Sequence, residues 1–422
     1  MNENASHFHS KGEMSPAGDR EVQRGSLNMK IERLRLKSIR NYESLDLTPH
    51  PGMNLFFGRN GAGKTNLLEA IHYCALGRSH RTAADRDTVR RDEPAGAVGV
   101  TVLSNSGSRS EISIRLTPGE AKGKTVFIDR KRAPRMADLM GHVRCVIFSP
   151  EDLMLVREGP SVRRRFLDML LSQLDPACFL ALQRYNRALE QRNSLLREQK
   201  RTGRSDSDLL FSYERLMAEA ASVIIPKRRA AGERLRAIAA QKYAAICGRE
   251  EEIFDLRYQP CTEATDPGII REEAALIWKG RREEDRIRGG TSFGPHREDL
   301  RLTLDAREMK LYASQGQIRT AALAMKLAQL ALIEEVSGEK PVLLLDDVMS
   351  ELDMTRRTRL LQEIGGAQTF VTCTDESDLE GLSERRTYRV TLGDDGCACV
   401  TETRPGDAAE GSPTETEEPD FN

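Results

Sequence analysis

The sequence contains no apolar run long enough to cross a bilayer. A membrane-spanning helix needs ~20 consecutive apolar residues, and even the clean aliphatic stretch at 342–345 is short. Residues 1–28 likewise hold no apolar block of the kind found in a secretory signal. We therefore expect a cytoplasmic protein with no membrane partner.

Paired cysteines and an excess of one charge are also lacking. The eight cysteines include no Cys-x-x-Cys spacing, and only Cys397 and Cys399 lie close together, which excludes a disulfide framework and a zinc ribbon. The net charge is −1, so the bulk balance says nothing for or against a nucleic-acid partner. The composition, 39% hydrophobic and 31% charged, is that of a soluble globular chain.

What is present predicts an α/β protein with two lobes, because 422 residues exceed what one average core holds. Strand-like segments fall at 54–57, 98–103, 112–116, 125–128 and 143–148, and again near 300–304, 342–346, 369–373 and 387–392. Between the two groups, residues 160–250 have helical apolar spacing. This order predicts a sheet-based lobe made of 29–155 and 300–402, with a helical lobe, 156–299, inserted between its halves. The polar ends, 1–28 and 403–422, are expected to be a disordered extension and a disordered acidic tail.

The segment 58–65, GRNGAGKT, matches G-x-x-x-x-G-K-[ST] between a predicted strand and a predicted helix. Glycines let backbone N–H groups face a polyphosphate, and the helix N-terminus adds a partial positive charge. In this pattern the lysine reaches the terminal phosphates and the threonine hydroxyl ligates Mg²⁺. The predicted nucleotide-binding residues are Gly58, Arg59, Asn60, Gly61, Ala62, Gly63, Lys64 and Thr65.

Two adjacent aspartates, Asp346 and Asp347, end the apolar strand at 342–346. Like charges at one strand end are costly unless a cation or solvent is near. In a P-loop ATPase the first carboxylate holds Mg²⁺ and the second orients or deprotonates the attacking water. We therefore predict Asp346 as a metal ligand with Thr65, and Asp347 as a catalytic residue with Lys64; the cofactors are ATP and Mg²⁺.

Ser314 and Gly316 lie in the segment SQGQ, just before an Ala- and Leu-rich helical run at 318–336. Alone, this segment is typical of a helix cap. Placed between the P-loop and the two aspartates, and with SELD at 350–353, it resembles the signature of ABC-type ATPases. The resemblance implies an ABC-type P-loop ATPase head, a mixed sheet flanked by helices, in which Ser314 and Gly316 contact the ATP of a partner chain.

Over about residues 29–400 the chain resembles the RecF family of SMC-like ABC ATPases, on the segments LKSIRNY (36–42), FSPEDL (148–153), RRRFLD (163–168) and SFGPHR (292–297). The resemblance implies a short helical lobe in place of a long coiled coil and an ATP-dependent homodimer. It also implies ATP-dependent binding of double-stranded and gapped DNA, with slow hydrolysis as a switch. The implied protein partners are RecR, with RecO and RecA acting indirectly on gapped DNA.

Several positions depart from the wider ABC pattern. Glu151 stands where many members have a glutamine, and a carboxylate cannot donate an amide hydrogen bond. Asp347 replaces a common glutamate, which shortens the reach by one methylene and is consistent with slow turnover. No histidine follows 369–373. We predict no metal site at His296, which lacks ligand neighbours at metal spacing.

A basic segment lies in the predicted helical lobe. Residues 157–204 contain eleven lysines or arginines and five acids, which predicts a sequence-independent contact with DNA phosphates. Within it, Arg163, Arg164 and Arg165 are the predicted DNA-binding residues, with a bracing role between the lobes as the alternative. Few aromatic residues are interleaved, so stacking on single-stranded bases is not indicated.

Two other functions remain open at this stage. A transporter-type ABC subunit would carry the same nucleotide motifs, but it normally lacks the helical lobe and its basic segment. A small-molecule P-loop kinase would leave the segments at 314–317 and 350–353 without a role. Binding to a membrane fraction would favour the first, and phosphate transfer by a monomer the second.

Overall fold

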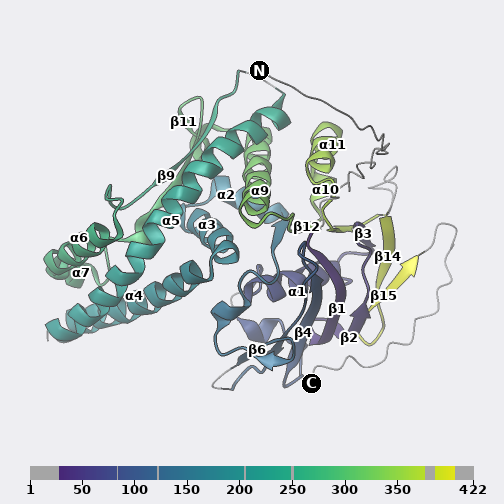
Figure 1. Ribbon diagram of the computed structural model, residues 1–422, viewed down its shortest axis with the longest axis horizontal. Coiled ribbons are helices and arrows are strands. Elements are labelled where there is room, and N and C mark those ends of the chain that lie inside the picture. Colours follow the sequence, from purple (N-terminus) through teal and green to yellow (C-terminus); the bar gives the residue numbers. More distant parts are fainter. Residues whose placement is uncertain are drawn as a thin grey trace, which may run out of the picture.

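The computed structural model describes residues 28–82, 84–120, 123–203, 206–248, 251–375 and 385–403. The predicted extension and acidic tail therefore lie outside the described residues, except for Asn28 and Thr403. Figure 1 shows a sheet-rich head on one side and a helical arm, residues 154–308, that projects away from it. The predicted α/β architecture, a mixed sheet flanked by helices with a helical insertion, is confirmed.

One sheet of the head has the strand order β15-β14-β3-β13-β12-β8 and is parallel except for β15 at its edge. Its central strands are apolar and buried, as expected where both faces of a sheet are covered. The bounds are β3 Met53–Phe57, β8 Cys145–Phe148, β12 Val342–Asp346, β13 Thr369–Cys373, β14 Arg385–Leu392 and β15 Ala398–Thr403. Because these strands run parallel, the carboxyl ends of β3, β13 and β12 share one edge.

The second sheet of the head is antiparallel, in the order β2-β1-β4-β5-β6-β7. Its strands are β1 Lys30–Ile39, β2 Tyr42–Leu47, β4 Gly96–Leu103, β5 Arg109–Leu116, β6 Lys124–Ile128 and β7 Lys131–Arg132. Helix α1, Lys64–Leu76, contacts strands of both sheets, and nearly all its residues are buried. A helix covered on all sides is held rigidly, and α1 therefore fixes the loop that precedes it.

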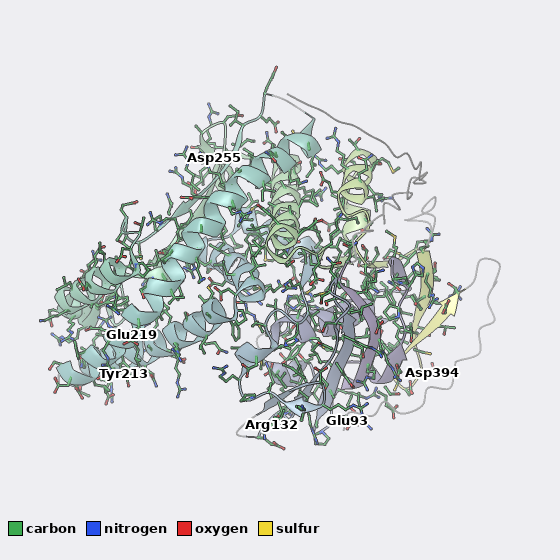
Figure 2. All side chains as sticks on the ribbon, viewed as in Figure 1. Glu93, Arg132, Tyr213, Glu219, Asp255 and Asp394 are labelled. Carbon is green, nitrogen blue, oxygen red and sulfur yellow. The ribbon has the colours of Figure 1, made fainter. Side chains whose placement is uncertain are left out.

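The arm is built on long helices and a small sheet. Helix α5 runs over 41 residues with Pro226 inside it. The helices are α2 Met154–Arg157, α3 Pro160–Leu174, α4 Pro176–Thr202, α5 Ser207–Cys247, α6 Pro267–Gly280 and α7 Arg282–Arg288. In Figure 2, Tyr213 and Glu219 mark α5 in the arm, whereas Arg132 marks the foot of the head.

The expected boundary at residue 300 is corrected by the pairing of the strands. Strand β10, Asp299–Leu304, pairs with β9, Phe254–Gln259, and with β11, Arg307–Glu308, and it joins neither sheet of the head. The small sheet packs on α5, so the strand at 300–304 belongs to the arm. The sequence misplaced it because apolar alternation identifies a strand without identifying its partner.

The chain returns to the head through α8, Met309–Tyr312, and α9, Gln315–Ser337. Helix α9 contacts α5 of the arm and β8 of the head, and its buried leucines and alanines belong to a core shared by both lobes. Two further helices follow β12: α10, Val348–Glu351, and α11, Met354–Glu363. No described helix combines the length and apolar character that a bilayer crossing requires.

Candidate nucleotide-binding site

The predicted P-loop connects β3 to α1, and two of its glycines are required by close contacts. Gly58 has φ +152°, and a Cβ there would lie 2.2 Å from the carbonyl oxygen of Val390. Gly63 has φ +115°, and a Cβ there would lie 2.6 Å from Nδ2 of Asn41. Any side chain at either position would displace backbone or a packed amide, so the loop's shape depends on these glycines.

Lys64 is the first residue of α1 and is only 5% exposed. Its Nζ donates hydrogen bonds to the carbonyl oxygens of Gly58 at 2.6 Å and Arg59 at 3.1 Å. The ammonium group therefore lies across the mouth of its own loop. A polyphosphate held by the loop N–H groups would meet this charge directly.

Thr65 and the Walker B aspartate are brought into contact at the shared strand edge. The Thr65 hydroxyl donates to Oδ1 of Asp346 at 2.7 Å, and the Thr372 hydroxyl, on β13 between β3 and β12, donates to the same oxygen at 2.8 Å. A hydroxyl and a carboxylate are hard oxygen donors, which suits Mg²⁺ bound also by phosphate oxygens. The two predicted metal ligands therefore fit the group predicted for them.

Asp347, the predicted catalytic carboxylate, has a left-handed backbone with φ +53° and ψ 18°. Its N–H donates to the Thr372 hydroxyl at 3.0 Å, which holds this conformation. A non-glycine residue in this region costs about 1–3 kcal/mol and is typical of functional sites. The turn directs Asp347 into the same cleft as Lys64 and Thr65.

The cleft that these residues line has a volume of about 1490 Å³, large enough for a nucleoside triphosphate. Outside the P-loop the wall includes the β1–β2 turn, residues 81, 86–87 and 89–94, Pro118, and the β14–β15 turn. Figure 2 labels Glu93, which belongs to this wall. Of the other predicted P-loop residues, Gly61 lines the cleft and Asn60 lines both the cleft and a second hollow of about 820 Å³. Gly58, Arg59 and Ala62 line the second hollow.

An amide network lies beside the P-loop, outside the predicted eight-residue pattern. Asn41 donates to the Ala62 carbonyl at 2.9 Å and accepts from Nδ2 of Asn66 at 2.8 Å. Arg81 in turn donates to Oδ1 of Asn66 at 3.3 Å and lines the cleft. Asn66 directly follows the lysine–threonine pair, and Arg81 follows α1, but neither belongs to the eight-residue pattern. Their only local signal was a polar side chain close to that pattern.

Arg40 occupies a different position from its neighbour. Its guanidinium makes two hydrogen bonds, of 2.9 and 2.8 Å, with the buried carboxylate of Glu69 on α1. Burial alone would raise the pKa of Glu69, but hydrogen bonds from Arg40 and Ser79 lower it below its usual value. Arg40 therefore holds the β1–β2 turn against α1 and places Asn41 beside the P-loop.

The signature residues lie outside the cleft of their own chain. Ser314 is exposed and caps α9, its hydroxyl accepting from Gln317 N at 3.3 Å, and Gly316 is half-buried. Neither lines the cleft around Lys64. Two arm residues hold this loop: Glu252 accepts from Nε2 of Gln317 at 3.2 Å, and Arg157 donates to Gln315 at 2.6 Å.

Glu151, Thr374, Asp375 and His296 do not line the nucleotide cleft. Glu151 is exposed and does not line the cleft, whereas the adjacent Asp152 pairs with buried Lys326 of α9 at 3.6 Å. Thr374 and Asp375 line the second hollow beside the P-loop. His296 bonds to Tyr185 at 2.7 Å and to the Thr291 carbonyl at 3.0 Å. Within the part of the chain that the structure describes, no group of three or more potential ligand side chains is arranged to hold a metal ion.

The predicted DNA-binding arginines separate into two kinds, and the assignment of Arg163 is corrected. Arg163 is 6% exposed and makes two 2.8 Å hydrogen bonds with Asp299, and its remaining nitrogen donates to the carbonyls of Leu155 and Glu158. Such a guanidinium has no free face for a phosphate. It joins α3 to β10 within the arm. Arg164 is half-buried and Arg165 is exposed.

Comparison with known proteins identifies the family of this chain. Residues 30–398 match the family model described as RecF/RecN/SMC N terminal domain. The DNA replication and repair protein RecF of Acetivibrio thermocellus is 40% identical over 355 residues, 83% of this chain and 95% of that protein. The RecF of Symbiobacterium thermophilum is 39% identical over 373 residues, 86% of this chain and 97% of that protein.

Solved structures agree with the sequence relatives. A structure described as the recombination mediator protein RecF-ATP in the RecFOR pathway superposes with a TM-score of 0.80 at 34% identity, covering 89% of this chain and 98% of that one. An Smc head domain from Pyrococcus furiosus, at 16% identity and TM-score 0.51, covers 89% of this chain and 96% of that one and shares the fold. The chain belongs to the RecF family, within the wider group of RecF, RecN and SMC heads.

Proposed function

We propose that this chain is an ATP-dependent DNA-binding recombination mediator that acts in DNA replication and repair. In this role ATP closes a homodimer on double-stranded or gapped DNA, slow hydrolysis reopens it, and RecR and RecO cooperate in placing RecA at the gap. The proposal draws on the names of its relatives and on the geometry of the cleft. The proposed activity takes place in the bacterial cytoplasm, without a membrane partner.

The cleft supports a hydrolytic step. Lys64 and the loop N–H groups hold the β- and γ-phosphates, and the N-terminus of α1 adds its partial positive charge. Thr65 and Asp346 would hold Mg²⁺, which would supply positive charge beside the phosphate oxygens. Asp347 orients a water whose oxygen attacks the γ-phosphorus; the bond to the bridging oxygen breaks, giving ADP and phosphate.

The observation that carries the proposal is the separation of the two halves of an ABC-type site. Lys64, Thr65 and Asp347 line the cleft, while Ser314 is exposed at the N-terminus of α9 and does not line the cleft of its own chain. The oxygen of a capping serine and the free N–H groups of a helix N-terminus suit a phosphate. A second copy of the chain would supply both, so ATP would be buried between two protomers.

This arrangement makes ATP a switch. The aspartate at 347 has a shorter reach than the glutamate usual at this position, which favours slow, DNA-stimulated turnover over metabolic hydrolysis. A transporter subunit and a small-molecule kinase are both disfavoured by family membership, and a kinase would have no use for an exposed Ser314.

The test combines DNA binding with sedimentation, with and without ATP and Mg²⁺. Wild type is expected to gain DNA affinity and dimer mass together when ATP is added. Lys64→Ala should lose both because it fails to hold ATP, and Ser314→Ala should bind ATP yet fail to dimerise. Ser207→Ala, at an exposed serine that begins α5, is the matched control. DNA binding that ignores both ATP and Ser314 would refute the proposal.

A further inference from the structure

A separate cleft of about 600 Å³ lies between the head and the arm. The head contributes the end of α1 and strand β6, and the arm contributes α3, α4 and α5. This cleft shares no lining residue with the nucleotide cleft around Lys64. Its size is that of an ordinary ligand site.

Four arginines line it. Arg228 is paired with Asp168 and Glu298, which leaves three guanidinium groups: Arg78 from the head, and Arg164 and Arg165 from α3. Among the described residues, no carboxylate forms an ion pair with any of the three. Their hydrogen bonds go to neutral carbonyls: Arg164 donates to Glu298 O at 2.7 Å, and Arg165 donates to His80 O at 3.3 Å. Carbonyls hold these side chains in place without neutralising them, and the nearby carboxylates of Asp168 and Asp299 offset only part of the charge of Arg78 and Arg164.

The other charges of the cleft are already matched. Asp168, the sole carboxylate in its wall among the described residues, makes hydrogen bonds of 2.9 and 3.0 Å with Arg228. Arg228 also pairs with Glu298 at 2.7 Å. Lys124 pairs with Asp85 at 3.0 Å. The charges within these pairs neutralise each other, so the three arginines make the electrostatic potential of the cleft positive.

The arginines also repel one another. Partial burial lowers the pKa of Arg78, and the nearby charge of Arg165 lowers it further. Burial likewise lowers the pKa of Arg164, with Arg228 adding to the effect. Like charges gathered from two lobes in a partly desolvated cleft destabilise the folded state unless an anion lies between them.

We propose that this cleft binds phosphate groups through Arg78, Arg164 and Arg165, and that in the working protein these phosphates belong to the DNA backbone. Arginine presents planar, bidentate donors that match phosphate oxygens. The assignment of the phosphates to DNA rests on the proposed function, whereas the phosphate chemistry of the cleft does not. Because the site spans both lobes, DNA held there also fixes the arm against the head.

The experiment measures affinity for gapped duplex DNA, with ATP and Mg²⁺, over a series of salt concentrations. The Arg78→Gln/Arg165→Gln double variant is expected to bind about 10-fold more weakly and to lower the salt slope by about 2, one unit for each phosphate that the variant no longer binds. Arg164→Gln should lower it by about 1. Arg271→Gln removes an exposed arginine of α6 outside the cleft and is the matched control, with no change expected in the slope beyond a few tenths.

A second experiment adds inorganic pyrophosphate to protein that carries Lys64→Ala, a substitution that weakens phosphate binding at the P-loop. Its effect on the thermal midpoint is compared with and without the cleft substitutions. Loss of DNA affinity in the cleft variants supports DNA as the source; loss of pyrophosphate stabilisation alone supports a free phosphate ligand. If folded cleft variants match Arg271→Gln both in DNA affinity and in stabilisation by pyrophosphate, the proposed phosphate site is rejected. Absence of DNA binding by wild type would reject the proposed function. The pyrophosphate experiment alone would then decide whether the cleft binds phosphate.

Discussion

The hydroxyl of Thr65 donates a 2.7 Å hydrogen bond to the carboxylate of Asp346, although 281 residues separate them in the sequence. Thr65 lies in the first turn of α1 and Asp346 ends β12, and Thr372 on the intervening strand bonds to the same oxygen. Parallel pairing of β3, β13 and β12 is what brings the groups together. The fold itself therefore brings the two expected Mg²⁺ ligands together.

Removal of the Thr65 hydroxyl tests this pair. Thr65→Val keeps the side chain's shape and removes the oxygen, so we expect Mg²⁺-dependent ATP hydrolysis to fall by about 100-fold or more. Thr65→Ser keeps the oxygen and should remain within a few-fold of wild type. Chelating Mg²⁺ should reduce wild-type hydrolysis to the level of the valine variant, as measured by phosphate release. A valine variant with wild-type activity would contradict the assignment.

The link between arm and signature gives a second prediction. Glu252 accepts hydrogen bonds from Gln317 at 3.2 Å and from Tyr243 at 2.7 Å, so it ties the end of α5 to the loop that holds Ser314. Glu252→Ala is expected to weaken ATP-dependent dimerisation by about 5- to 10-fold, the equivalent of removing one or two hydrogen bonds. Nucleotide affinity of the monomer should not change, because the P-loop is untouched.

Sedimentation in the presence of ATP measures the first quantity, and titration with a fluorescent ATP analogue measures the second. Glu251→Ala, at the exposed neighbouring acid, removes the same charge and serves as the control. Equal dimerisation of the two variants would show that Glu252 does not position the signature loop.

The sequence located the site best where the functional residues are adjacent in the chain. The P-loop, the two aspartates and the signature each occupy a few adjacent residues, and strands β12 and β13 fall where apolar runs predict them. Thr372 and Asn41 could not be placed in the same way. Thr372 reaches Asp346 through strand order, and Asn41 reaches Ala62 through a turn fixed by Arg40. Both relationships arise only when distant segments pack.

The error at Arg163 had a local cause that the sequence did contain. Arg163 shares a helix face with Phe166, Leu167 and Leu170, at the spacing of three, four and seven residues that marks a buried stripe. Arg165 lies on the opposite face and is exposed. Three consecutive arginines therefore point in different directions. The charge count treated them as one patch, whereas helical periodicity separates them.

Stability measurements distinguish the two arginines. Arg163→Ala removes the cation that pairs with the Asp299 carboxylate and the donor to two carbonyls, so we expect a loss of about 3 kcal/mol in the free energy of unfolding. Arg165→Ala should change it by about 0.5 kcal/mol or less, since the side chain is exposed. Urea denaturation followed by circular dichroism measures both. Equal losses would show that the contact with Asp299 does not brace the arm.

Acid sensitivity of the arm provides the final prediction, and it depends on His296. Burial lowers the pKa of His296 from 6.5 to about 4. The Thr291 carbonyl can only accept, so Nε2 carries the proton and Nδ1 accepts from the Tyr185 hydroxyl. The folded protein thus holds the neutral ring. Below about pH 6.5 the unfolded chain binds a proton that the folded chain does not, and folding stability falls as the pH drops towards 4.

One such group lowers the free energy of unfolding by about 1.4 kcal/mol per pH unit over this window. His296→Gln lacks the hydrogen bonds of the ring, so the variant should be less stable than wild type at pH 7. Because glutamine cannot take up the proton, the stability of the variant should fall less steeply between about pH 6.5 and 4.5. Urea denaturation at half-unit pH steps measures the two slopes. His80, whose pKa burial also lowers to about 4, is retained in both proteins and contributes equally, so the difference in slope isolates His296. Parallel curves for the two proteins would mean that His296 titrates alike in the folded and unfolded states, and that the neutral ring between Tyr185 and Thr291 is not what makes the arm sensitive to acid.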